Sequence, residues 1–375
     1  MGGGTAGGLS SAVMSLTGDP IDASLIVPLS AIVDARRIIA GVVHRTPMLS
    51  SATAARIAGA AAGITLGDGR LYLKAEHLQK TGCFKPRGAT VRMAHLPDGA
   101  RAAGVIAISA GNHAQGLAWA ARAAGVRATV VMPAGVSASR VAACRGYGAE
   151  VVLHGETIGE AWAEMERLRD VRGLTFVHPF DDTDIVAGQG TIGLEILEDL
   201  PAVDVVVIAA GGGGLACGIA AAVKETRPGI RAWAVEPERS AALSLAIAAD
   251  EIVRIEPDSI ADGLGAPFAG PRTLAMGKRY LDGIALVDDD TIAAAMRFGA
   301  ERLKQVLEPA GAAALAAVLA GKVPLRDGDR ACVVLCGGNV EAARFAELIG
   351  AAGSFPDPAE RAVRMGEVRP PRSAV

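Results

Sequence analysis

A lysine surrounded by small and apolar residues is the first candidate for chemistry in this sequence. Lys85 lies in the segment TGCFKPRG, which runs from Thr81 to Gly88 and follows a predicted strand. A lysine in a tight, partly apolar site loses the hydration of its charged form, so its pKa falls and its amine becomes a nucleophile. Taken alone, the segment is also typical of a surface lysine near a turn.

A second candidate is the segment SAGNH, where a predicted strand ends and a helix begins. The backbone N–H groups at the start of a helix favour an anion such as a carboxylate. Asn112 is also a residue type that commonly caps a helix, and this purely structural interpretation stays open. The segment consists of Ser109, Ala110, Gly111, Asn112 and His113.

Four consecutive glycines form the third candidate. They stand between the run DVVVIAA and an Ala-rich predicted helix, and the segment consists of Gly211, Gly212, Gly213, Gly214 and Leu215. Such a backbone can wrap around a phosphate, and the helix dipole adds positive potential. The segment lacks the Lys-Ser/Thr pair of a nucleotide-binding P-loop, and with Ala216 it matches the dinucleotide motif only in its weaker GxGxxA form. We expect a phosphate site here.

The fourth candidate is Cys336, in the segment LCGGN at the end of the last predicted strand. A cysteine in such a place is most often a buried, unreactive thiol. Together, the four segments would supply a reactive amine, an anion site, a phosphate cradle and a small polar contact. This combination suits a cofactor that carries an aldehyde group and a phosphate.

The elements that must position these segments are short β-branched runs that alternate with longer amphipathic stretches. Strands that alternate with helices form parallel sheets covered on both faces, so the pattern predicts an α/β fold. In such sheets ligands bind beyond the carboxyl ends of the strands, where loops such as these lie. The expected strands are 71–74, 105–109, 128–132, 151–153, 205–209, 232–235 and 332–335, and the expected helices are 114–124, 138–146, 158–171, 192–200, 215–226 and 342–349.

Composition narrows the class of protein. The 375 residues are 51% hydrophobic, and the net charge of -3 provides no basic field for nucleic acid or an anionic membrane. The five cysteines form no CxxC pair, so neither a disulfide framework nor a zinc site is indicated, and a cytoplasmic location fits. The uncharged stretch 205–223 is long enough to span a membrane, but its glycines favour a strand, a loop and a buried helix. We therefore expect a small-molecule substrate, with no nucleic acid and no membrane as partner.

In these motifs the sequence resembles the fold-type II enzymes that use pyridoxal 5'-phosphate (PLP), namely the threonine and serine dehydratases (ammonia-lyases) with the serine racemases. The matching motifs follow that family's order over about residues 29–349. They are LKAEHLQKTGCFKPRGA (73–89), SAGNHAQG (109–116), HPFDD (178–182), GQGTIGLEI (188–196), GGGGL (211–215), VEPE (235–238), ADGL (261–264), EPAGAAALAA (308–317) and CGGN (336–339).

The resemblance implies a tryptophan synthase β-like fold, with two three-layer αβα domains and mostly parallel sheets. Residues 25–100 and 180–352 would form a large PLP-binding domain and residues 101–179 a small domain, without an appended regulatory domain. Residues 1–24 are expected to be a flexible leader, in which Met14 is a candidate start codon, and residues 353–375 a C-terminal tail. Members of the family are commonly homodimers.

The resemblance also implies a role for each matching position. Lys85 would be the catalytic residue, which forms a Schiff base with PLP and takes the Cα proton of the substrate. Phe84 would flank the ring, Asn112 would bind the phenolic oxygen, Gly211 to Leu215 would bind the phosphate and Cys336 would face the pyridine nitrogen. The segment from Ser109 to His113 would hold the substrate carboxylate. The expected reaction removes the hydroxyl and amino groups of L-threonine or L-serine and gives a 2-oxo acid and ammonia.

Some positions differ from the residues that are usual in the family. Cys336 stands where most threonine dehydratases have serine, and a neutral thiol there would leave the pyridine nitrogen neutral, which suits elimination. Ala110 replaces the serine that racemases use on the opposite face of the ring, so racemisation is expected to be poor. Some members bind a divalent cation near Glu236, but its second acidic ligand is replaced by Ala242, and no metal is predicted.

Other functions stay open at this point. A dehydratase for another hydroxy amino acid such as hydroxyaspartate is one alternative, and a serine racemase-like enzyme is another. Enzymes of β-replacement usually carry Asp after the lysine, where this chain has Pro86. A nicotinamide-binding protein is disfavoured because no acidic residue follows the glycines at the spacing that a ribose requires.

Overall fold

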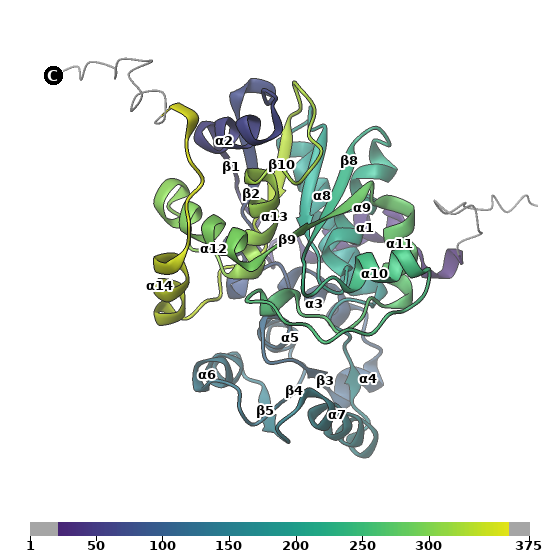
Figure 1. Cartoon of the computed structure of the whole chain (residues 1–375). Coiled ribbons are helices and arrows are strands. Elements are labelled where there is room, and N and C mark those ends of the chain that lie inside the picture. Colours follow the sequence, from purple (N-terminus) through teal and green to yellow (C-terminus); the bar gives the residue numbers. More distant parts are fainter. Residues whose placement is uncertain (1–21, 360–375) are drawn as a thin grey trace, which may run out of the picture.

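Two β-sheets of different size organise the chain. The computed structural model describes residues 22–359 and is shown in Figure 1. The larger sheet has six strands in the order β1-β2-β10-β7-β8-β9, and the smaller sheet has four in the order β5-β4-β3-β6. All strand pairs in this part of the chain are parallel except β1 with β2. The expected α/β fold with mostly parallel sheets is confirmed.

The strands are short, and several are continuous apolar runs. They are β1 (Met48–Ser51), β2 (Leu71–Lys74), β3 (Val105–Ile108), β4 (Ala128–Met132), β5 (Glu150–Leu153), β6 (Thr175–Phe176), β7 (Val205–Ala209), β8 (Arg231–Pro237), β9 (Gly283–Val287) and β10 (Ala331–Val334).

Helices connect most of the strands. They are α1 (Leu29–Ile39), α2 (Ala52–Ala62), α3 (Pro86–Ala94), α4 (Asp98–Ala103), α5 (Asn112–Ala123), α6 (Ala138–Gly146), α7 (Ile158–Arg172), α8 (Thr183–Asp199), α9 (Gly214–Thr226), α10 (Ala242–Ala249), α11 (Pro271–Tyr280), α12 (Asp289–Phe298), α13 (Pro309–Leu319) and α14 (Ala342–Ala351). Short 3-10 turns lie at η1 (Ala23–Leu25), η2 (Gly67–Gly69), η3 (Glu76–Leu78), η4 (Lys80–Gly82) and η5 (Asp262–Leu264), and a π-helical turn lies at η6 (Gly299–Leu303).

The large sheet has β10, the last strand of the described residues, at an inner position. β10 pairs in parallel with β2 on one side and with β7 on the other, so that Val333 lies opposite both Leu73 and Val207. All five residues of β7 are buried, which means that both faces of the sheet are covered. Helices α9 and α13 both pack on its strands. The run 205–223 therefore forms a buried strand followed by α9, as expected.

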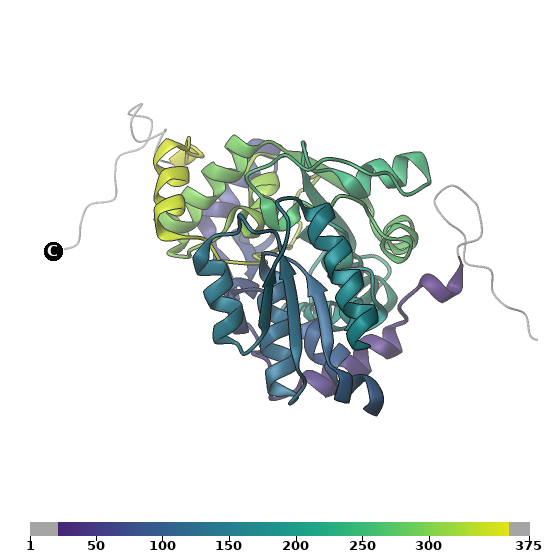
Figure 2. The same ribbon diagram turned by 90° about the horizontal axis from the view of Figure 1, so that it is seen from below.

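The small sheet shows how alternate side chains of a strand reach opposite faces. Val105 and Ala107 of β3 point into a core with residues of α5, whereas Ile106 and Ile108 join residues of α7 on the other face. Figure 2 shows this sheet in front, with helices on both sides. The small sheet is thus the middle of three layers.

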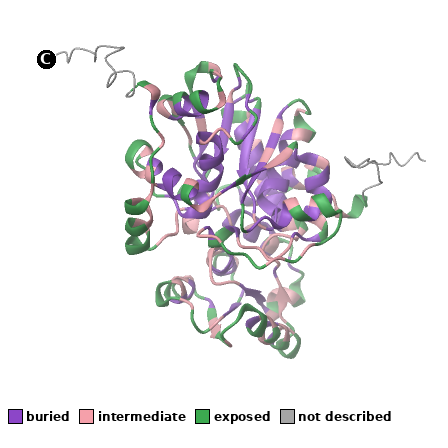
Figure 3. Ribbon diagram, viewed as in Figure 1, coloured by how far each residue is buried: buried purple, intermediate pink, exposed green. Residues whose placement is uncertain are grey.

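Burial is concentrated along the strands and the helices that pack on them, and the outer helices are exposed (Figure 3). Helix α14 has no buried residue. None of the helices within residues 22–359 is long and apolar enough to cross a membrane. The first 21 residues of the expected leader and residues 360–375 of the expected tail lie outside the described part of the chain.

Candidate active site

One cavity of about 950 Å³ is lined by residues from all four candidate segments. Three of the segments follow directly from the carboxyl ends of strands: β3 leads to Ser109, β7 leads to the glycines and β10 leads to Cys336. Parallel α/β sheets offer binding sites at these strand ends. The lining includes every residue singled out from the sequence, namely Phe84, Lys85, Ser109, Ala110, Gly111, Asn112, His113, Gly211, Gly212, Gly213, Gly214, Leu215 and Cys336.

The Lys85 side chain lies in this cavity and not at a surface turn. Lys85 stands directly before α3, whose first residue is Pro86, a residue suited to the start of a helix. Its Nζ donates a hydrogen bond of 2.7 Å to the Pro179 carbonyl and lies 5.1 Å from the centre of the Phe84 ring. Burial lowers the pKa of Lys85 to about 8. A larger fraction of this amine is therefore neutral near neutral pH than for a solvated lysine.

Asn112 does not cap α5 through its side chain, so the capping interpretation is wrong. The cap position is Gly111, and Asn112 is the first residue of the helix. Its Nδ2 donates to Glu308 Oε1 at 2.6 Å, and its Oδ1 accepts from Asn339 Nδ2 at 2.8 Å. These two contacts fix which end of the amide is the donor. An amide nitrogen carries two hydrogens, so one N–H is left for a ligand oxygen.

Glu308, the partner of Asn112, is a buried acid on the wall of the cavity. Burial raises the pKa of Glu308 to about 8, although the hydrogen bond from Asn112 opposes this shift. Asn339 also donates to the Thr81 carbonyl at 2.6 Å. The three side chains thus link the lysine segment, the start of α5 and the loop after β10.

The segment before α5 is held by its own polar groups. Gly111 N–H donates to Ser109 Oγ at 3.2 Å, which tightens the turn. His113 is buried, and burial lowers its pKa to about 3, so the ring is neutral. Its Nε2 lies 3.0 Å from the Val177 carbonyl, and because a carbonyl only accepts, this nitrogen carries the proton. The histidine therefore links the segment to Val177, the residue that follows β6. Ala110 presents a methyl group and no hydroxyl.

The glycine segment has no room for side chains. A Cβ at Gly212 would lie 2.4 Å from the Phe180 ring, and a Cβ at Gly214 would lie 2.6 Å from the Phe180 carbonyl oxygen. Gly213 has a φ of +91°, which other residues rarely adopt. Helix α9 begins at Gly214, and the first N–H groups of a helix have no partner within it. The backbone is thus bare and rich in donors, which fits a phosphate group.

Cys336 meets the cavity as a neutral thiol. Its Sγ donates to the Ala310 carbonyl at 3.3 Å. Burial raises the pKa of this thiol well above its usual value. A neutral thiol provides no negative charge that would stabilise a protonated ring nitrogen.

Four further cavity residues were not assigned roles from the sequence. Pro179 accepts the hydrogen bond from Lys85, Phe180 packs on the glycines, and Glu308 with Asn339 orients Asn112. All four lie in the motifs HPFDD, EPAGAAALAA and CGGN, so their positions were visible. Their contacts depend on which loops meet in space, and the sequence pattern alone does not show that.

Glu236 is engaged in capping a helix. Its two carboxylate oxygens accept from Leu243 N–H at 2.8 Å and from Ser244 N–H at 2.9 Å, at the start of α10. No group of three or more His, Cys, Asp or Glu side chains within residues 22–359 has the geometry of a metal site. The absence of a bound metal stays a prediction.

Comparison with known proteins agrees with this geometry. Residues 39–337 match the family model described as "Pyridoxal-phosphate dependent enzyme". An L-threonine ammonia-lyase from Thermotoga maritima is 40% identical over 317 residues, which are 84% of this chain and 76% of that protein. A catabolic L-threonine dehydratase from Staphylococcus aureus is 38% identical over 86% of this chain and 92% of its own length.

A solved structure is also similar. The maize serine racemase superposes with a TM-score of 0.79 at 31% identity, and the match covers 91% of this chain and 99% of the racemase. The family model spans more than half of the sequence, and its matched range contains the lysine, asparagine, glycine and cysteine segments that line the cavity. The chain belongs to the family of pyridoxal-phosphate dependent enzymes.

Proposed function

We propose that this enzyme removes the hydroxyl and amino groups of a β-hydroxy amino acid, with L-threonine, L-serine or both as substrate, and releases a 2-oxo acid and ammonia. The names of the similar proteins support this reaction. The observation that carries the proposal is that the Lys85 amine shares one cavity with the glycine segment and the start of α5. An amine, a phosphate cradle and a carboxylate site are the three contacts that this chemistry requires.

The proposed roles of the cofactor contacts follow from the geometry. Lys85 would hold PLP covalently, the backbone from Gly211 to Leu215 would bind its phosphate, and the free N–H of Asn112 would meet its phenolic oxygen. Phe84 would flank the ring, and Cys336 would face the ring nitrogen as a neutral thiol. When bound, PLP withdraws electrons from the Cα of the attached amino acid.

The chain's own groups would then control the proton and the substrate. Backbone N–H groups of the segment Ser109 to His113 would bind the substrate carboxylate at the start of α5. Once the substrate amine has displaced it, the free Lys85 amine, whose pKa burial lowers to about 8, would accept the Cα proton. Loss of the β-hydroxyl as water and hydrolysis of the released enamine then give the 2-oxo acid and ammonia.

The two alternatives are a dehydratase for another hydroxy amino acid, such as hydroxyaspartate, and a serine racemase-like enzyme. Racemisation requires a second proton donor on the opposite face of the ring, and Ala110 supplies only a methyl group at the cavity wall. We therefore place elimination first.

The test compares Lys85→Ala with Lys80→Ala, because Lys80 lies in the same family motif (73–89) and does not line the cavity. We expect the wild type and Lys80→Ala to absorb near about 410 nm with bound PLP, and Lys85→Ala to lose both this band and turnover. Each protein would be incubated with L-threonine, L-serine, hydroxyaspartate and D-serine, and the 2-oxo acid measured. Full activity of Lys85→Ala, or racemisation without 2-oxo acid, would contradict the proposal.

We propose further that residues 25–100 with 180–352 and residues 101–179 are two domains, each built on one of the two sheets. A homodimer is proposed as well, to be checked by light scattering on the eluting protein. A cytoplasmic location is proposed because all five cysteines are free and buried, which requires no oxidising compartment.

A further inference from the structure

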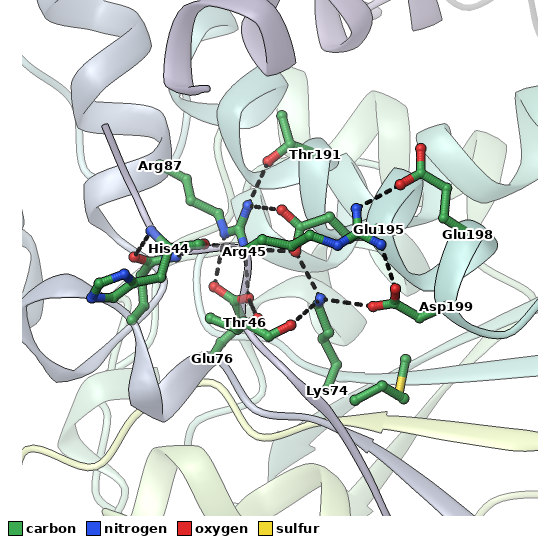
Figure 4. A network of polar contacts seen from close by, with 12 residues as sticks. His44, Arg45, Thr46, Lys74, Glu76, Arg87, Thr191, Glu195, Glu198 and Asp199 are labelled. Carbon is green, nitrogen blue, oxygen red and sulfur yellow. Dashed lines mark hydrogen bonds and ion pairs between the residues drawn. The ribbon is translucent and has the colours of Figure 1, made fainter. Parts of the chain in front are cut away.

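A cluster of buried charges lies directly beside the lysine segment. Arg87, two residues after Lys85, is fully buried, as are Lys74 and Glu76, and Glu195 is nearly so. Figure 4 shows the Arg87 guanidinium between the carboxylates of Glu76 and Glu195. Two cations and two carboxylates are thus removed from water together.

Arg87 makes six hydrogen bonds to four partners. Its Nε and one terminal nitrogen donate to Glu76 at 2.9 and 2.8 Å, and its terminal nitrogens donate to Glu195 at 2.7 and 3.0 Å. Thr191 Oγ1 accepts at 3.2 Å, and the His44 carbonyl accepts at 3.3 Å. The planar guanidinium group fixes the directions of its hydrogen bonds to these partners, whereas the ammonium group of a lysine does not.

These partners come from separate parts of the fold. Glu76 lies in η3 after β2, whereas Thr191 and Glu195 lie on α8. Lys74 adds a second bridge, because its Nζ lies 2.7 Å from Glu195 and also donates to the Thr46 carbonyl at 2.7 Å. The cluster therefore joins the first turn of α3 to the middle of α8 and to the end of β2.

Helices α3 and α8 follow the two residues that form the Lys85–Pro179 hydrogen bond. The backbone of Lys85 leads into α3, and its amine donates to Pro179, four residues before α8 begins. The helices touch through glycines, since a Cβ at Gly188 would lie 2.4 Å from Gly88 Cα. A shift of α3 along α8 would therefore move the Lys85 amine relative to the cavity.

Stability alone is a weak explanation for such a cluster. Burying ion pairs removes hydration, and well-packed apolar residues of the same volume often stabilise a fold equally well or better. An apolar contact does not fix one orientation of the two groups, whereas the hydrogen bonds of a guanidinium group are directional.

We propose that Arg87 is a positioning residue, which locks the first turn of α3 to α8 and thereby sets the place of the Lys85 amine over the cavity. This inference rests on the proposed covalent role of Lys85. It assigns to Arg87 no contact with PLP or substrate.

The test separates the covalent bond from the remaining cofactor contacts. PLP forms a bond with the lysine, whereas 4-deoxypyridoxine 5'-phosphate lacks the aldehyde and uses only the ring and phosphate contacts. Affinities for both would be measured with Arg87→Lys, which keeps the charge and loses the planar guanidinium group. The matched control is Arg45→Lys, at the exposed edge of the same cluster, where Arg45 pairs with Glu198 at 2.6 Å.

We expect Arg87→Lys to weaken PLP binding by about tenfold or more, since small misplacements of a reacting group have large effects, and to change the affinity of the deoxy analogue by less than about twofold. Arg45→Lys should change neither affinity. Equal loss of both ligands, or loss of neither, would overturn the proposal. If Arg87→Lys does not fold, Glu195→Gln gives the same test, with a selective loss of about threefold expected and an unselective or absent loss overturning the proposal.

Borohydride reduction of the wild type with PLP, followed by peptide mass analysis, identifies the lysine that binds PLP. This result distinguishes a failure of the proposed function from a failure of the proposed role of Arg87. Labelling of a lysine other than Lys85 would overturn the proposed function and this inference with it. Labelling of Lys85, combined with unselective behaviour of the variants, would overturn the role of Arg87 alone.

Discussion

At the scale of single residues, the site combines groups whose protonation is set by burial more than by charged neighbours. Burial is the largest influence on the pKa of Lys85, His113, Glu308 and Cys336. In each case it favours the neutral form. The cavity therefore offers a neutral amine, imidazole, carboxyl group and thiol, which suits a ligand that brings its own phosphate and carboxylate charges.

The raised pKa of Glu308 makes the stability of the folded chain depend on pH. Burial raises its pKa to about 8, so the folded chain keeps a proton that the unfolded chain releases from about pH 4.5 upward. The contribution of Glu308 to stability is thus full below about pH 4.5 and is lost as the pH rises toward 8.

A Glu308→Gln variant cannot ionise and should escape this loss. Relative to the wild type, its free energy of unfolding is expected to rise by about 3 kcal/mol between pH 5 and pH 8. Urea unfolding of the two PLP-free proteins at both pH values measures the difference. A difference that does not change with pH would show that Glu308 is ionised in the folded protein.

At the scale of elements, the glycine segment is a bare backbone with no room for side chains, which suits the proposed phosphate site. The Phe180 ring fills the space beside Gly212, and this contact places the segment at the end of β7. Gly212→Ala would introduce a Cβ 2.4 Å from that ring, so the segment or the ring must move.

We expect Gly212→Ala to weaken 4-deoxypyridoxine 5'-phosphate binding by about tenfold or more, because the phosphate donors are displaced. Gly229→Ala is the control, since a Cβ there would meet nothing within 4 Å. Equilibrium dialysis measures both affinities. Unchanged binding by Gly212→Ala would mean that the phosphate lies elsewhere.

The elements that the sequence predicts best are those with a simple apolar pattern. The ranges 128–132 and 205–209 agree with β4 and β7, because both are runs of buried residues in which only Thr129 is polar. β1, β6 and β9 were missed: MLSS is half polar, β6 has only two residues, and β9 is only partly buried. Helix α8 begins at Thr183 and not near 192. Its glycines weaken a helix prediction, but they let neighbouring helices approach: Gly188 faces α3, and Gly193 faces α9.

The candidate site was also predictable only in part. The position of each strand-end loop was predictable, since parallel strands bring their carboxyl ends to one edge. The contacts of Lys85 with Pro179 and of Asn112 with Glu308 were not, because they join residues 94 and 196 positions apart. Only the packed structure shows which of the buried polar groups meet.

At the scale of the whole molecule, all five cysteines are buried and free, and burial raises the pKa of Cys83 to about 12 and of Cys144 to about 11. A thiol must ionise and be reached by the reagent in order to react. We expect fewer than about one thiol per native chain to react with Ellman's reagent within an hour at pH 8, and all five in denaturant. Rapid reaction of two or more native thiols would show that the chain opens readily.

The inner position of β10 has a consequence for how the enzyme is made. During synthesis on the ribosome, the strand that precedes Lys85 and the strand that precedes the glycines cannot join one sheet until residues 331–334 have emerged and slotted between them. The facing edges of β2 and β7 must therefore stay unpaired until then, a state that invites aggregation and chaperone binding. The cavity is therefore completed only after residues 331–334 have been translated, and a product that ends before them would carry Lys85 and the glycines without the strand that joins β2 to β7.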